Sequence, residues 1–268
     1  MREVTPAPRR KPFAPREFVE AHLDPARTGP GPRGHGFSPD NADDDTAHYA
    51  FRMAPGVTGI SLDTTNTNGF AAGSLGLAQY RWLEEVLTRN SSRYRSDLGR
   101  EHHQPVSDEL FVVFSHHTST TISALWSDDC EPVEPRFGGG SVVKRLQRFP
   151  NVVAWVNGHT HSNAITAHPA DDPEFGFWEV ATASHVDYPQ LARSSELVDN
   201  RDGTLSLFTV MVESDAPYAV DYDDRSPAAL ASLYRELAFN DPQRDLSHVG
   251  QAGDRNAELL LPGRFPGR

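Results

Sequence analysis

The sequence VVAWVNGHTH, at Val152–His161, carries the strongest structural signal in this chain. Its first residues are β-branched, small or aromatic, which is typical of a buried strand. Gly158 then permits a sharp turn and a close approach of the backbone to a ligand. If the chain leaves the strand still extended, His159 and His161 share a face and point at one centre. Imidazole is a common metal ligand, so this pattern predicts a metal site where the strand ends.

A second apolar strand, upstream of the first, also ends on histidine. Glu109–Thr118 has the sequence ELFVVFSHHT, in which the adjacent residues His116 and His117 follow the apolar run. Open α/β sheets bind ligands outside the carboxyl ends of their strands. Two strands of one sheet that both end on histidine can place three imidazoles around a shared site. This coincidence carries the functional interpretation.

The order of these two blocks resembles the last two metal-binding blocks of the calcineurin-like metallophosphoesterases. The resemblance rests on a strand ending in Ser-His-His, a helix, and a strand ending in Gly-His-Thr-His. Ile60–Thr64 and Gly73–Gln79 are similar to the strand and helix that the family places just before the first of these two histidine blocks. Phe177–Leu205 resembles the strands that close the domain in a bacterial branch. The resemblance covers most of Arg9–Glu213.

This resemblance implies a two-metal phosphoester hydrolase that acts on a small phosphoester. In a complete member, two divalent ions (Mn, Fe or Zn) hold the phosphate and generate hydroxide. By the resemblance, His116 and His159 bind one metal and His161 binds the other. His117 is assigned to the catalytic site at the substrate rim, with structural packing as an equally open alternative.

Three blocks of the family's pattern are missing before residue 57. They are Asp-x-His, Gly-Asp-x-x-Asp and Gly-Asn-His-Asp/Glu, and the upstream tripeptide Gly34–Gly36 offers only Gly-His-Gly. The chain therefore resembles the C-terminal half of the fold, beginning at an internal Met. The family's bridging carboxylate lies in the missing half, so we expect at most one metal ion. Three imidazoles can hold one Zn²⁺ with an open fourth position.

The sequence leaves three functional hypotheses. The first is a metal-dependent phosphoester hydrolase that is impaired or inactive as this truncated chain, and that needs a longer form or a separate N-terminal polypeptide. The second is a non-catalytic remnant that exposes an unpaired sheet edge. The third, another histidine-based metal hydrolase, is disfavoured. Ser162 and Asn163 stand where a metallo-β-lactamase has Asp-His, and the helical His-Glu-x-x-His motif is absent.

Composition limits the partners. The formal net charge of -12 argues against a nucleic-acid or anionic-membrane surface. The single cysteine, Cys130, excludes an internal disulfide and a Cys-rich zinc site, and we interpret it as an incidental thiol. No apolar run approaches membrane-spanning length, and the start lacks a signal-peptide core. The compartment is left unassigned, with the cytoplasm as the default.

The predicted fold class is α/β, as half of a two-sheet β-sandwich flanked by helices. We divide the chain into a Pro/Gly/Arg-rich arm (1–45), a metallophosphoesterase-like domain (46–240) and a disordered tail (241–268). Helices are expected over Pro15–Leu23, Ser74–Asn90, Ser141–Phe149 and Pro227–Phe239. Strands are expected over His48–Met53, Val57–Asp63, Leu110–Ser115, the run ending at Gly158, Ala164–Ala167, Gly176–Ala183, Ser195–Asp199 and Leu205–Val212.

Several polar residues receive structural interpretations. Asn41–Asp45 is expected to be a solvated turn, and Asp63 to fix the turn at Thr64–Asn68. Arg145 and Arg148 are assigned to the wet face of their helix. The hydroxyls of Thr118–Thr121 are equally suited to bind phosphate or to cap the next segment. His185 and Asp187 could contact substrate, but a structural role is preferred.

Overall fold

The computed structural model describes residues 5, 7, 13–27, 33–126 and 134–263. Cys130 lies outside these residues. The helices that position the site are α3 (Leu77–Arg89) and α4 (Gly139–Leu146). The others are α1 (Pro15–Leu23), α2 (Pro39–Asp43), α5 (Pro227–Asn240) and the short 3-10 turns η2 (Arg33–Gly36), η3 (Pro173–Phe175), η4 (Leu246–Val249) and η5 (Ala252–Asp254). None of the helices in the described part of the chain is long and apolar enough to cross a membrane.

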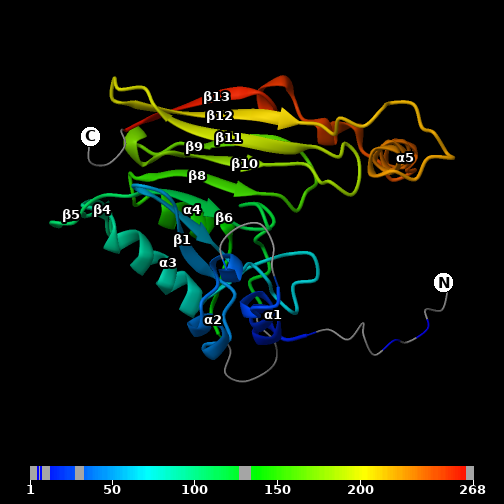
Figure 1. Cartoon of the computed structure of the whole chain (residues 1–268). Coiled ribbons are helices and arrows are strands. Elements are labelled where there is room, and N and C mark those ends of the chain that lie inside the picture. The colour runs from blue at the N-terminus through cyan, green and yellow to red at the C-terminus, as the bar shows by residue number, and fades with distance from the viewer. Residues whose placement is uncertain (1–4, 6, 8–12, 28–32, 127–133, 264–268) are drawn as a thin grey trace.

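The largest sheet has six strands in the order β1-β2-β6-β8-β10-β9. Its four central strands, β2, β6, β8 and β10, run parallel, and β1 and β9 are antiparallel edge strands. The carboxyl ends of the parallel strands therefore share one edge, on the side to which β8 points in Figure 1. Their bounds are β1 (Tyr49–Ala54), β2 (Val57–Ser61), β6 (Leu110–Phe114), β8 (Val152–Asn157), β9 (Ala164–His168) and β10 (Phe177–Ala181).

Three smaller sheets complete the structure. A three-stranded antiparallel sheet has the order β11-β12-β13, formed by β11 (Ala192–Asp199), β12 (Thr204–Val212) and β13 (Ala257–Pro262). Two strand pairs are short: β3 (Leu75–Gly76) with β7 (Arg136–Phe137), and β4 (Arg93–Arg95) with β5 (Glu101–His103). The two strands expected over Ser195–Asp199 and Leu205–Val212 are confirmed and form an antiparallel hairpin, in which Asp199 pairs with Leu205.

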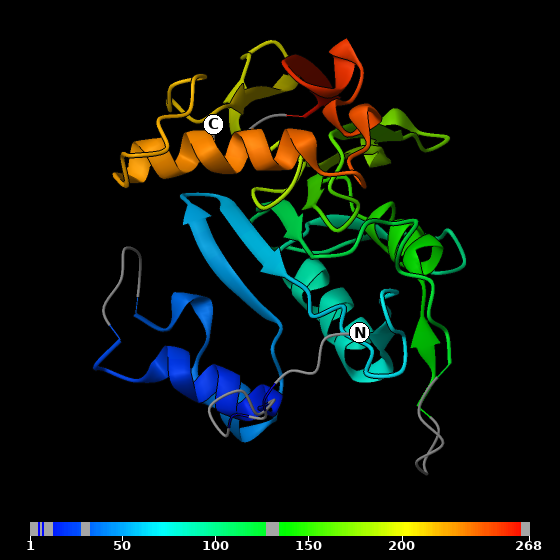
Figure 2. The ribbon, with the colours of Figure 1, turned by 90° about the vertical axis from the view of Figure 1, so that its right-hand side faces the viewer.

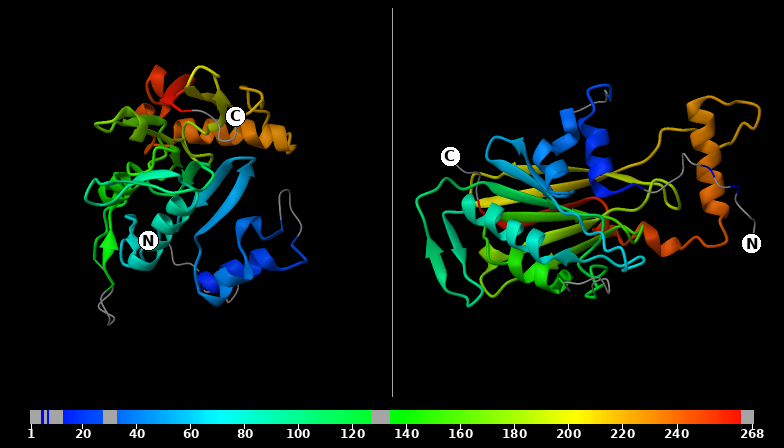
Figure 3. Two further views of the ribbon diagram at one scale, coloured as in Figure 1. Left: turned by 90° about the vertical axis from the view of Figure 1, so that its left-hand side faces the viewer. Right: turned by 90° about the horizontal axis from the view of Figure 1, so that it is seen from below.

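The central strands are buried on both faces, which explains their nearly continuous apolar sequences. One face packs on α3 and α4 in a cluster that includes Leu83, Phe111 and Trp155. The opposite face packs on the three-stranded sheet, where Val112 and Val153 share a cluster with Leu207. Helices, six-stranded sheet and three-stranded sheet thus form successive layers (Figure 1, and Figure 3, right, seen from the helical side). The α/β class is confirmed, while its identity as half of a metallophosphoesterase sandwich stays a prediction.

The predicted disordered tail is wrong for residues 257–262, which form β13. Leu259 and Leu261 alternate with exposed residues and bury their side chains against the larger sheet. The Pro, Gly and Arg content of the region obscured this period of two. Residues 264–268 lie outside the described part of the chain.

The N-terminal arm contains more structure than its composition indicates. The helix at Pro15–Leu23 is confirmed, and Val19 on it is fully buried. The expected solvated turn at Asn41–Asp45 is wrong for its first part, because α2 covers Pro39–Asp43 and Asn41 is buried. The Asn41 side-chain amide donates to the Thr46 hydroxyl and the His48 carbonyl. Asn41 therefore tethers the segment Thr46–His48 to α2 instead of facing water.

The helices on the sheet also correct two assignments. The helix expected over Ser74–Asn90 begins later, after Gly76 as N-cap, and the Ser74 hydroxyl accepts from the Arg136 side chain. Arg145 and Arg148 do not form a wet face, since both are buried and pair with Glu84. The Arg145 guanidinium also lies over the Tyr80 ring. Their apolar stems and paired charges let them lie between the helices.

Leu83 tests the contact between α3 and the sheet because its side chain is fully buried there. Replacing it with alanine leaves a cavity, and we expect Leu83→Ala to lower the free energy of unfolding by about 2–5 kcal/mol. Leu98→Ala is the matched control, since Leu98 is 96% exposed and should change it by less than about 0.5 kcal/mol. Urea denaturation followed by circular dichroism measures both. Equal effects of the two variants would contradict this packing.

Candidate metal centre

The histidine loops leave the sheet from neighbouring parallel strands. β6 ends at Phe114 and β8 at Asn157, and Phe114 pairs with Val156. Two backbone hydrogen bonds join the loops that follow: the Ser115 amide donates to Val156, and the Gly158 amide donates to His116. The register of the sheet therefore carries the two histidine blocks to the same edge.

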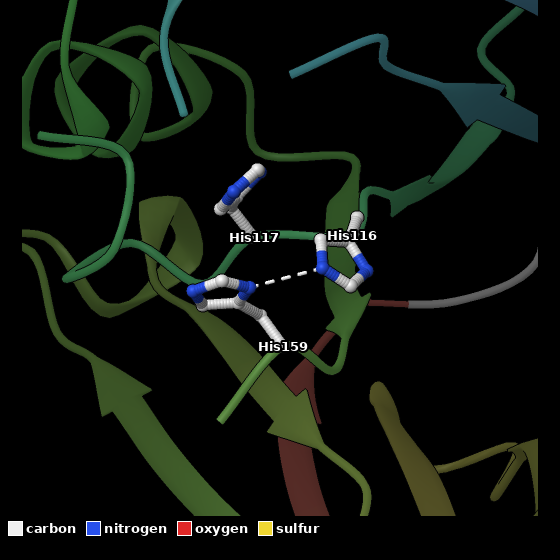
Figure 4. A group of neighbouring side chains, drawn as sticks. All are labelled: His116, His117 and His159. Carbon is white, nitrogen blue, oxygen red and sulfur yellow. Dashed lines mark hydrogen bonds between the residues drawn. The ribbon is translucent and has the colours of Figure 1, made fainter. Parts of the chain in front are cut away.

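Three imidazoles meet at this edge (Figure 4). His116 Nε2 lies 2.9 Å from His159 Nδ1. The rings of His117 and His159 have centroids 4.4 Å apart. One ring nitrogen from each of the three lies within 4.8 Å of the others. The structure thus brings together His116 and His159, and it adds His117 as the third member.

His161 is not a member of this group in the described structure. The expectation of an extended chain is wrong, because His159 has φ 63° and His161 has φ 55°. In the left-handed region the alternation of side chains along a strand is lost. The ring of His161 turns instead to Asp187, with Nδ1 2.5 Å from Oδ2. Its role as a metal ligand stays a prediction.

His117 lies in the cluster and also has structural partners, while its assignment to the catalytic site stays a prediction. It is buried, with Nδ1 2.7 Å from the Thr64 hydroxyl and Nε2 3.2 Å from the Ala71 carbonyl. A carbonyl only accepts, so Nε2 carries the proton and Nδ1 accepts from Thr64. Metal-bound histidines commonly donate their second N–H to such a carbonyl. A metal at Nδ1 would have to displace the Thr64 hydroxyl, so His117 is the ligand with a competing structural bond.

The protonation of the cluster favours metal binding. Burial, reinforced by the neighbouring His159 and His116, lowers the pKa of His117 to about 4. Burial and the same kind of repulsion, from His116 and His161, also lower the pKa of His159. Only an unprotonated imidazole nitrogen can bind a metal. These two rings are therefore available as ligands at neutral pH.

Glu179, on β10, supports the loop after His117 and was missed in the sequence analysis. Its buried carboxylate accepts from the Ser119 amide and hydroxyl, at 2.7 and 2.6 Å, and from the Asn157 side chain at 2.7 Å. His168 Nε2 lies 2.7 Å away as well. Burial alone raises the pKa of Glu179, but these hydrogen bonds outweigh it and the net shift is downward. The sequence feature that could have identified Glu179 is that it is the single carboxylate within the apolar strand FWEVA.

The remaining polar residues near the cluster have structural partners. The Trp155 indole donates to the Ser115 hydroxyl, which donates to the His117 carbonyl. The Thr118 amide donates to the Thr121 hydroxyl, so this hydroxyl has a partner within the loop. Asp63 accepts from the Thr65 amide at 2.9 Å, which confirms its predicted role in the turn.

The donor set fits one divalent ion better than two. All three members of the described cluster are imidazoles, and borderline-soft ions such as Zn²⁺ accept three histidines with one open position. His116 is exposed, so one side of the cluster faces solvent. Two cations side by side need a bridging carboxylate to offset their repulsion, and no carboxylate belongs to this cluster in the described residues.

Comparison with known proteins gives little further information. No family model matches the chain, and no curated protein matches it. Among solved structures, the chain is similar to a dimetal phosphatase from Danio rerio, with 15% sequence identity and a TM-score of 0.40. The match covers 62% of this chain and 58% of that chain, so this chain spans less than two thirds of that structure. A likeness of this size carries no functional argument.

The low pKa of His117 makes stability depend on pH in the metal-free protein. The unfolded chain binds a proton near the ordinary value of 6.5, whereas the folded chain does so only at about 4. Stability is therefore lost as the pH falls through this window, by about 1–2 kcal/mol between pH 7 and pH 5. Urea titrations of chelator-treated protein at the two pH values measure the loss. His117→Gln should reduce it, whereas the exposed-site control His103→Gln should not.

Gly73 holds His117 in place by leaving room for its ring. A Cβ at residue 73 would lie 2.5 Å from His117 Nδ1 and 2.6 Å from the Thr64 carbonyl oxygen. We expect Gly73→Ala to displace the ring and to lower the free energy of unfolding by about 1–3 kcal/mol. Gly140→Ala is the control, because a Cβ there meets nothing within 4 Å and alanine favours the helix. Urea unfolding of wild type and both variants decides whether the close contact exists.

Proposed function

We propose that this chain is a metal-dependent phosphoester hydrolase that is impaired or inactive in the form described here. The observation that carries the proposal is the convergence of His116, His117 and His159 at the carboxyl edge of the parallel strands. This edge is where open α/β sheets bind ligands. The order Ser-His-His, helix, Gly-His-Thr-His, which resembles the metallophosphoesterase blocks, supplies the reaction class.

In this proposal His116 and His159 hold one divalent ion, and His117 is the third ligand or fixes the loop that carries His116. A bound divalent ion would polarise the phosphate oxygens and lower the pKa of a bound water. The protein's own residues keep the site ready for the ion. The low pKa values of His117 and His159 keep both rings neutral, and Glu179 anchors the loop through Ser119.

The assignment of His161 to a second metal is also part of the proposal, with a condition attached. The ring would have to release Asp187, because Nδ1 of His161 is bonded to that carboxylate. If His161 binds through Nε2 instead, Asp187 would orient it from behind, as carboxylates do for many metal-bound histidines. The second ion would still need a bridging carboxylate, which supports impaired activity for this chain.

The alternative is a non-catalytic remnant, or a fragment that requires a separate N-terminal half. The outer strand of the large sheet, β1, favours this alternative, since most of its residues are exposed. An exposed edge strand can pair with another chain. A fragment completed by an N-terminal polypeptide could therefore use this edge, with the histidine cluster receiving its missing carboxylate from the partner.

Metal binding and hydrolysis test the two readings together. We expect the purified chain to bind about one Zn²⁺ or Mn²⁺ per chain, as for a three-histidine site. We expect slow hydrolysis of p-nitrophenyl phosphate or bis-p-nitrophenyl phosphate in the presence of Mn²⁺. His159→Ala should abolish both, because His159 is central to the cluster. Equilibrium dialysis and absorbance of the released p-nitrophenolate are the measurements.

His103→Ala is the matched control, since His103 is exposed on β5 and its ring lies beside Glu101, outside the cluster. It should retain binding and hydrolysis at the wild-type level. One bound metal without hydrolysis would favour the fragment or remnant. Less than one bound ion per chain with every divalent metal would remove the metal centre, and the hydrolase with it.

A further inference from the structure

A groove lies beside the histidine cluster, between α5 and the loop after β10. Figure 2 shows α5 crossing the end of the molecule to which β8 points in Figure 1. Two adjoining cavities of about 310 and 380 Å³ lie along its inner side. Both are lined by His185, Gln190 and Tyr234, so they form one continuous groove. Its volume is in the range of small-molecule sites.

We propose that this groove binds an organic cation with an apolar body, as the alcohol part of the phosphoester that the histidine cluster would cleave. The identity of the ligand as part of a phosphoester rests on the proposed function. The preference for an organic cation rests on the groove alone. The groove would thus select among substrates by the group attached to the phosphate.

The groove is joined through Asp187 to His161, in the loop that also carries His159. Asp187 lines the larger cavity, and its Oδ2 atom is bonded to His161 Nδ1 at 2.5 Å. His161 is two residues from His159, one of the three clustered imidazoles. In this proposal a phosphoester with its phosphate at the cluster places its organic part along α5, past His161 and Asp187.

Apolar side chains line most of the groove, although they face solvent. In the larger cavity, Leu237 is 57% exposed, Tyr234 is 53% exposed and Val186 is 81% exposed. Apolar and aromatic side chains are the usual lining of small-molecule sites. A ligand with an alkyl or aromatic body would remove these side chains from water.

The position of α5 is fixed by contacts with the segment that follows β12 and with Tyr188. Arg235 donates to the carbonyls of Ser214 and Ala216, and Ser232 donates to that of Pro217. At the other end, the ring of Phe239 lies edge-on to that of Tyr188. The helix is therefore held at both ends, and the groove exists before a ligand binds.

The charges of the groove specify the sign of the ligand. Asp187 and Asp241 line the larger cavity, and neither forms an ion pair with Arg or Lys in the described part of the chain. The described lining residues of both cavities include no Arg or Lys. Glu213 in the smaller cavity is compensated, since Arg235 lies 3.8 Å from it. The larger cavity therefore attracts cations and repels additional phosphates, and the Tyr234 ring can stack on an ammonium group.

Calorimetric titration of the metal-stripped full chain with benzyltrimethylammonium chloride tests this proposal. The probe has an aromatic body and a fixed positive charge. We expect saturable binding, weakened about fivefold by Tyr234→Ala and by Asp241→Asn, in line with a cation–π contact and one lost charge. Asn at residue 241 can still accept from the Gln243 amide, as Asp241 does, so the helix end is preserved. Sodium benzoate, an aromatic anion, should show no saturable binding.

Asp223→Asn is the control for charge, because Asp223 is exposed near the start of α5 and does not line either cavity. It should bind the probe like wild type. No saturable binding, or equal weakening by Asp223→Asn and Asp241→Asn, would overturn the groove as a cation site. The titration contains no metal, so its result is independent of hydrolysis. A chain that binds no divalent metal but still binds the cation would contradict the hydrolase but not the groove.

Discussion

The parallel pairing of β6 with β8 is the interaction on which the candidate site depends. Both strands are buried between α3 and α4 on one side and the three-stranded sheet on the other. This burial fixes their register, because a slip by one residue would turn their apolar side chains to the wrong layer. The fixed register in turn places the Ser115–Thr118 and Gly158–His161 loops together, joined by two backbone hydrogen bonds. The packing of the core thus determines where the histidine cluster forms.

The sequence was sufficient to predict the structure where apolar residues recur at the spacing of a strand or a helix. It placed the central strands, the helices on the sheet and the convergence of His116 with His159. It failed for His161, because the left-handed backbone at His159 and His161 cannot be read from residues that usually avoid it. It also failed for Glu179 and Arg145, whose burial depends on partners that are distant in the sequence. The groove along α5 is formed by segments that no local pattern connects.

The polar interior is concentrated around the loops of the cluster. Glu179 has four polar partners, the Ser119 amide and hydroxyl, the Asn157 side chain and His168, and Ser115 relays between Trp155 and the backbone of His117. Buried polar groups that are fully paired restrict the conformations of the segments they join. The loops therefore have little freedom to rearrange around a ligand. Such rigidity suits a site whose ligands must hold a fixed geometry.

The position of β13 has a consequence for how the chain folds. β12 pairs with β11 through a short hairpin. Its other edge pairs with β13, which follows in the chain only after α5 and two short turns. Closing that long loop delays the pairing, because distant contacts form slowly. During this delay the hairpin presents an open edge and uncovered leucines, so the three-stranded layer is the part most prone to aggregate during refolding.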